Sequence, residues 1–141
     1  MAIKALNLAS TVDYVVKSDR SSERPTIFKL GTLDSRVVGL IKDMGVAFKT
    51  DTNNPDAQAE TILRNSKIQF LTVQFGLIGF ENFLDSNDNV INHTTEKYTL
   101  GDKTYNILSE DILKTLPGDV LVELYQEITA LNQPSEDELK N

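Results

Sequence analysis

The residues best placed to do chemistry lie in a polar segment, residues 85–96. Four of its oxygen-bearing side chains match ligand positions one, three, five and twelve of a calcium-binding loop: Asp85, Asn87, Asn89 and Glu96. The match fails at position six, where Val90 replaces the glycine that allows the sharp turn. An Asx-rich turn without metal is therefore the favoured interpretation, and a small calcium-binding module is kept as an alternative.

The single histidine, His93, lies in the same segment. A catalytic histidine needs an acid that orients it and a nucleophile or substrate within reach. Thr94, Thr95 and Glu96 follow in sequence, but adjacency in sequence does not create a triad. A solvated loop histidine is the favoured interpretation.

Acidic side chains on two expected C-terminal helices form the remaining cluster: Asp111, Asp119, Glu123 and Glu127. Their helices are apolar on other faces, so this pattern is typical of a solvated face. The sequence contains no second cluster that would turn these acids into a metal cage or an acid–base pair. We therefore predict a protein that is not an enzyme and that uses no cofactor.

The overall charge and composition limit the classes of partner. The chain has 141 residues, a formal net charge of −7 and no cysteine. An acidic protein repels nucleic-acid phosphates and anionic membrane surfaces, so neither is an expected partner. No stretch approaches the ~20 apolar residues of a membrane span. A soluble, cytoplasmic protein is the default expectation.

The hydrophobic patterns predict an α+β fold with an N-terminal β-hairpin, a long central helix, a second short hairpin and a C-terminal helix. A single globular domain is expected over residues 1–132, followed by an acidic flexible tail over residues 133–141. Whether the two hairpins share one sheet stays open. The expected elements are strands at 10–18 and 26–33, a helix capped by Asp34, a central helix over 59–84 capped by Asn54 or Asp56, strands at 97–100 and 104–108, a helix at 110–116 capped by Ser109, and a helix at 117–131.

The central segment carries the densest apolar pattern. From Phe70 to Leu84 its apolar residues recur at steps of three and four, which is one face of a helix. Gly76 and Gly79 interrupt that helix, at a cost of ~1 kcal/mol each relative to alanine. They indicate a close approach of another backbone or an early helix end near Gly79. The apolar face is the predicted partner-binding surface, formed by Phe70, Val73, Leu77, Phe80, Phe83 and Leu84.

Two segments resemble small proteins of tailed bacteriophages. Residues 71–89, LTVQFGLIGFENFLDSNDN, are similar to a Gly-Leu-x-Gly-aromatic-Glu-Asn-Phe-x-Asp segment of those proteins. Residues 116–124, LPGDVLVEL, with the acidic tail, are similar to their C-terminal end. The family is that of tail assembly chaperones and related small tail-morphogenesis proteins. Its members are implied to coat the tape-measure protein before tail-tube subunits polymerise around it.

This resemblance and the apolar central segment lead to one functional hypothesis. We expect a non-enzymatic phage assembly protein that binds the tape-measure or tail-tube protein through the apolar helix face, with self-association as a further expectation. It would act in the host cytoplasm during assembly. The first alternative is a permanent virion protein of the head–tail connector or tail, and the second is the calcium-binding module.

Overall fold

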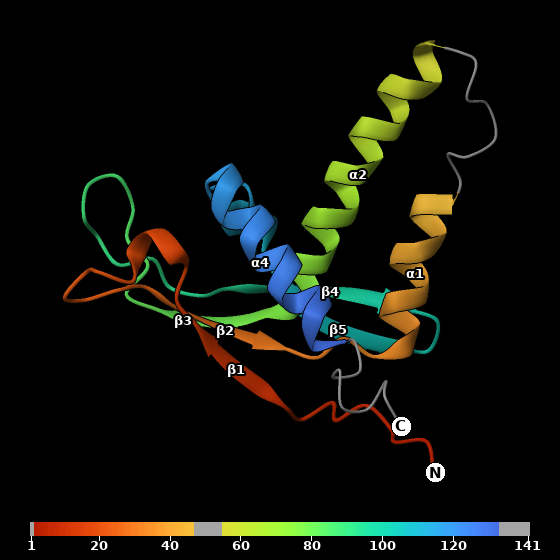
Figure 1. Cartoon of the computed structure of the whole chain (residues 1–141), viewed down its shortest axis with the longest axis horizontal. Coiled ribbons are helices and arrows are strands. Elements are labelled where there is room, and N and C mark those ends of the chain that lie inside the picture. The colour runs from red at the N-terminus through yellow and green to blue at the C-terminus, as the bar shows by residue number, and fades with distance from the viewer. Residues whose placement is uncertain (1, 47–54, 133–141) are drawn as a thin grey trace.

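The fold is α+β, as the sequence predicts. The computed structural model describes residues 2–46 and 55–132, with side chains for residues 2–43 and 66–132. Within these ranges the helices and strands follow one another along the chain (Figure 1), as β1 (Thr11–Tyr14), a short 3₁₀ turn (Lys17–Asp19), β2 (Ile27–Gly31), α1 (Ser35–Val46), α2 (Pro55–Gly76), β3 (Leu77–Glu81), β4 (Thr95–Leu100), β5 (Lys103–Leu108), α3 (Glu110–Leu113) and α4 (Gly118–Leu131).

The predicted N-terminal hairpin is present and gains a third strand. β1 pairs antiparallel with β2, and β2 pairs antiparallel with β3. The register between β2 and β3 shifts by one residue between Lys29 and Leu30, which leaves Ile78 as the extra residue of a bulge. β2 is therefore the central strand, and Phe28 and Leu30 on its inner face are almost fully buried.

The predicted second hairpin is also present, and it forms a separate two-stranded sheet of β4 and β5. Its strands extend to Thr95 and Lys103, and Gly101 lies in the turn with a φ of +66°. A left-handed backbone there suits glycine, which has no Cβ to clash. The question that the sequence left open is thus answered, because the two hairpins lie in different sheets.

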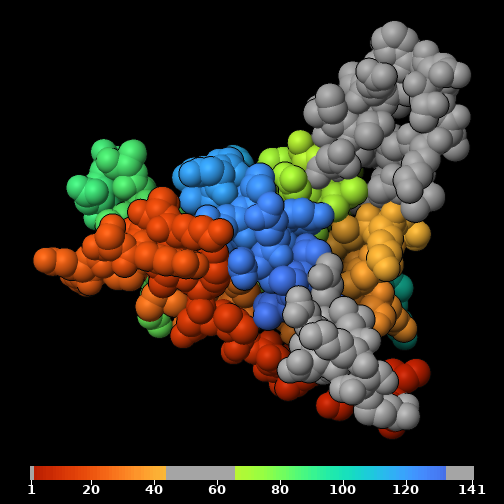
Figure 2. Space-filling model, viewed as in Figure 1, coloured from red at the N-terminus to blue at the C-terminus, as the bar shows by residue number. Residues whose placement is uncertain are grey.

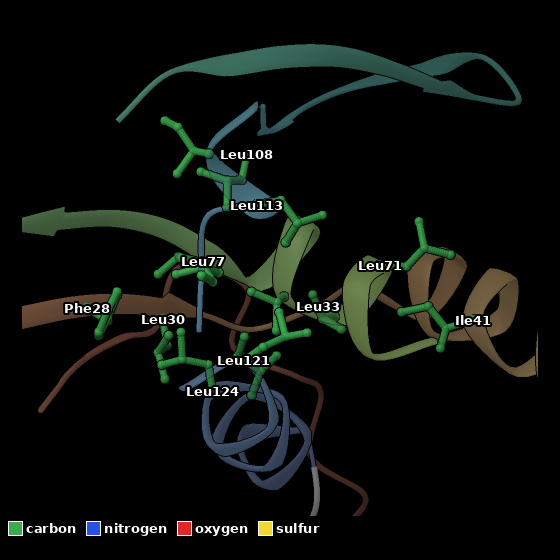
Figure 3. Packing of buried hydrophobic residues seen from close by; sticks show 14 of the residues in the cluster. Phe28, Leu30, Leu33, Ile41, Leu71, Leu77, Leu108, Leu113, Leu121 and Leu124 are labelled. Atoms are coloured by element: carbon green, nitrogen blue, oxygen red, sulfur yellow. The ribbon is translucent and has the colours of Figure 1, made fainter. Parts of the chain in front are cut away.

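The core lies where the first sheet, the described part of α2, α3 and α4 meet. Figure 3 shows apolar side chains from these elements converging, among them Leu77 of β3 and Leu124 of α4. Leu124 and Ile128 are fully buried at positions four apart on α4, which places them on one face of that helix. This packing fixes α4 against α2 and the sheet.

The prediction of one central helix through Leu84 is wrong. α2 ends at Gly76, and the next five residues form β3. A Cβ at Gly76 would lie 2.6 Å from Cγ2 of Ile128 and 2.7 Å from its Cδ1. The glycine therefore marks a close approach of a side chain of α4, where the sequence suggested a backbone.

Two of the predicted helix caps can be compared with the structure. Asp34 caps α1 as expected, since its Oδ1 accepts a hydrogen bond from the Val37 N–H at 3.0 Å. Ser109 precedes α3 but makes no capping bond with its side chain. The Glu110 N–H instead donates to Oε2 of Glu96 at 3.2 Å. The predicted caps Asn54 and Asp56 and the predicted tail, residues 133–141, lie outside the described residues and side chains.

Candidate protein-binding site

The six residues predicted to form one binding face are distributed over three environments. Val73 and Leu77 are 0% and 1% exposed, so they belong to the core. The aromatic rings of Phe80 and Phe83 lie 5.1 Å apart and pack with Phe28 of β2. Because the helix ends before Leu77, these residues do not share a helix face.

Only two of the six predicted residues are substantially exposed. Phe70 on α2 is 41% exposed, and Leu84 in the loop after β3 is 40% exposed. Phe70 lies one turn before Gln74, whose amide donates to the Leu108 carbonyl at 2.9 Å. Phe70 therefore lies on the side of α2 that faces the second hairpin, and the loop of Leu84 projects from another part of the molecule (Figure 1).

A more coherent apolar surface lies between three helices. Side chains from α1, α2 and α4 and the segments next to them enclose a groove of about 270 Å³. We call it the helix groove. Its lining residues are Leu33, Val38, Ile41, Lys42, Ile68, Thr72, Tyr125, Thr129 and Asn132.

Three of the polar side chains that line the helix groove, Thr72, Thr129 and Asn132, are hydrogen-bonded within the chain. The Thr72 hydroxyl donates to the Ile68 carbonyl, and the Thr129 hydroxyl donates to the Tyr125 carbonyl, each at 2.8 Å. Asn132 accepts from the Leu33 N–H at 3.3 Å and donates to its carbonyl at 2.7 Å. The groove therefore offers a partner mainly carbon atoms, and its lining includes one charged residue, the exposed Lys42.

The calcium-loop residues do not assemble as ligands. Oδ1 of Asp85 accepts the N–H groups of Asn87 at 2.8 Å and Asn89 at 3.0 Å, which makes it the organiser of a turn. Glu96 lies on β4, where it accepts from the Glu110 N–H and the Gln74 amide. Among the side chains that the structure describes, no group of three His, Cys, Asp or Glu residues is arranged to hold a metal.

His93 is half-buried, so the prediction of a solvated histidine is wrong. Its Nε2 lies 3.2 Å from the Leu77 carbonyl, to which it donates as the Nε2–H tautomer, and its ring packs edge-on against Phe80 at 5.1 Å. This arrangement ties the loop to Leu77, the first residue of β3. It gives His93 a packing role next to the first sheet.

A second set of hydrogen-bonded and charged side chains is centred on Asp34. Burial disfavours its charged form, but hydrogen bonds from Tyr105, the Val37 N–H and Lys103 together hold the pKa of Asp34 below its usual value. Burial and the nearby Asp34 carboxylate raise the pKa of Tyr105. Because every partner is internal, this cluster links α1 to β5 and has the character of a structural site.

Glu123, predicted to lie on a solvated face, makes a similar link between α4 and β1. It accepts from the Tyr14 hydroxyl and from the Lys17 N–H at 2.9 Å. Burial and the bond to Glu123 raise the pKa of Tyr14 to about 12. The prediction of a solvated carboxylate is therefore wrong at this position.

Sequence reasoning missed the helix groove because its residues come from three separate helical segments. Each segment shows an apolar pattern, but the patterns do not indicate which apolar residues are left partly exposed.

Comparison of the chain with protein-family models, with curated proteins and with solved structures found no match. The described helices include none that is long and apolar enough to span a bilayer.

Proposed function

We propose that this chain is a non-enzymatic assembly protein that binds other proteins by receiving an apolar side chain in the helix groove. The observation that supports this proposal is the groove itself, since its volume of about 270 Å³ is close to the lower limit for small-molecule pockets. Protein interfaces are commonly anchored by one large side chain that fills a pocket of this kind.

The chemistry of the groove defines the segment that would bind. The hydroxyls of Thr72 and Thr129 and the amide of Asn132 are satisfied internally, so a polar side chain would gain few hydrogen bonds from them. An apolar side chain would lose its contact with water and gain packing. The positive charge of Lys42, an exposed residue of the lining, favours an acidic residue beside that anchor.

We further propose that the partner is a structural protein of a tailed bacteriophage, the tape-measure or tail-tube protein, which the chain shields before polymerisation. This step rests on the sequence resemblance of residues 71–89 and 116–124. The test is capture of the tagged chain from infected cells, with mass spectrometry of its partners and of purified particles. Recovery of a tail protein in the capture, without the chain in the particles, would support a chaperone. Stoichiometric presence in the particles would support the virion alternative.

A pair of variants on neighbouring positions of α2 tests the groove. Ile68→Asp places a charge in the groove lining and should weaken capture of the tail protein about tenfold or more. Phe70→Asp is the matched control, because Phe70 lies on a different side of the same helix and is already 41% exposed. Loss of capture by Phe70→Asp alone would contradict the groove and would indicate that the partner binds at Phe70, as the sequence predicted.

A further inference from the structure

The outer edge of β1 is unpaired within the described residues. β1 bonds to β2 on one side, and no described strand adjoins it on the other. A free edge presents backbone N–H and C=O groups that pair readily with another strand. Figure 2 shows the surface around β1 (red) at the border of the visible face. Asp13 is the one charged side chain in this strand.

The apolar core covers Tyr14 at the end of β1 but does not cover Val12. Val12 is paired with Leu30, and residues directly opposite each other in a ladder lie on the same face of the sheet. Val12 is 38% exposed, whereas Leu30 is 1% exposed. The inward face of the sheet is thus closed at the central strand and open at its edge, where a continued sheet would cover Val12.

The segment before β1 adds further apolar surface next to the same strand. In residues 2–10, Ile3, Leu6 and Leu8 are 99%, 42% and 55% exposed. The Ser10 N–H donates to the Asn7 carbonyl in a turn of this segment, and Leu8 lines a small pocket with Val37 of α1 and Phe75 of α2. Single exposed apolar residues are common, but several beside an open strand edge are typical of an interface.

We propose that β1 pairs antiparallel with β1 of a second copy of this chain, around a two-fold axis next to Val12. The three-stranded sheets of the two copies then form one continuous six-stranded sheet. A second copy is the expected occupant because one register makes β1 complementary to itself. Two-fold pairing of identical surfaces is also the commonest closed arrangement of soluble oligomers.

The register follows from the side chains. With Val12 opposite Val12 of the second copy, Asp13 faces the Thr11 hydroxyl and the two valines cover one another. A shift that sets Asp13 opposite Asp13 would place like charges in direct opposition, which is destabilising. A shift the other way sets Val12 opposite Ser10 and leaves the valine without an apolar partner. The pairing of Val12 with Val12 therefore gives Val12 an apolar neighbour and keeps Asp13 away from a like charge.

Cross-linking tests this register directly, because the chain has no cysteine. Directly opposite Cβ atoms lie close enough for a disulfide or a short bis-maleimide. The Val12→Cys variant should therefore give a covalent dimer at concentrations where the wild type self-associates. Val122→Cys is the control, since Val122 is comparably exposed, at 36%, but lies on α4. Equal cross-linking of both variants, or of neither, would overturn the proposal.

Light scattering of the full chain provides the second test. The wild type should be a dimer, and Val12→Lys should weaken its dissociation constant about tenfold or more by opposing two ammonium groups. An unchanged circular dichroism spectrum would show that the Val12→Lys variant is folded. If Val12→Lys does not fold, the cross-linking of Val12→Cys still tests the proposal. A wild type that is monomeric at its highest soluble concentration would contradict the proposal. The Ile68→Asp variant should still dimerise, which separates this interface from the helix groove.

Discussion

Residues 71–77 and residues 2–12 both carry large apolar side chains, and the fold covers the two regions to very different degrees. In the first region Val73 and Leu77 are fully buried, and the phenylalanines after them pack around Phe28. In the second region Ile3 is 99% exposed and Val12 of β1 is 38% exposed. The more apolar of the two regions is therefore the better covered.

The difference arises where the chain changes direction. At Gly76 the helix ends against Ile128, and the chain enters the sheet as β3. This turn delivers apolar residues to the core from both a helix and a strand. Among the described strands β1 has a neighbour on one side only, so its Val12 stays at the margin. Exposure depends on which neighbours the topology supplies, and the local density of apolar residues does not reveal it.

The largest expected effect separates the two regions by stability. Leu77→Ala removes a side chain that is 1% exposed and should lower the free energy of unfolding by about 2–5 kcal/mol. Leu8→Ala makes the same chemical change at a position that is 55% exposed, and it should change stability by less than about 0.5 kcal/mol. Urea unfolding followed by circular dichroism measures both. Similar losses in the two variants would show that Leu8 is covered in solution.

The next effect tests the cause of the helix end. Gly76→Ala would place a methyl group 2.6 Å from the buried Ile128, and overpacking of this kind should cost about 1–3 kcal/mol. Gly39 on α1 is the matched control, because a Cβ added there would meet no atom within 4 Å. Gly39→Ala should raise stability by up to about 1 kcal/mol through helix propensity. Thermal unfolding measures both variants. If Gly76→Ala were the more stable of the two, the contact with Ile128 would not be the reason for glycine at position 76.

Much of the fold could be predicted from local patterns. The two hairpins have alternating apolar residues and clear turn residues, and α4 has regular apolar spacing after Pro117. The Asp34 cap is likewise a local signal. The end of α2 could not be placed, because the steps of three and four continue past Gly76 into β3. The contact that makes a glycine necessary there comes from Ile128, 52 positions later in the chain.

The candidate site was less predictable than the fold. The sequence pointed to an apolar segment, but the helix groove combines Val38, Ile68 and Tyr125, and no local pattern relates them. The same limit explains Glu96, whose spacing from Asp85 matches a calcium loop. Its place on β4 brings it next to the start of α3, and it serves there as the cap that Ser109 does not provide.

The smallest expected effect concerns the charge on Asp34. This residue caps α1 and binds Tyr105 and Lys103 of β5. Asp34→Asn keeps an oxygen for the Val37 N–H, and asparagine caps a helix about as well as aspartate does. It removes the charge that Tyr105 and Lys103 bind. The expected loss at neutral pH is about 1 kcal/mol.

The pH dependence of that loss identifies its origin. Because the folded-state pKa of Asp34 lies below its usual value, its contribution is complete above the unfolded-state pKa and disappears as the pH falls through the folded-state pKa. The stability difference between the wild type and Asp34→Asn should therefore shrink in acid. Asp102→Asn, which breaks an exposed ion pair with Arg36, should have little effect at any pH. A difference for Asp34→Asn that stays constant down to strong acid would show that the amide disturbs packing, and that the carboxylate charge does not hold α1 to β5.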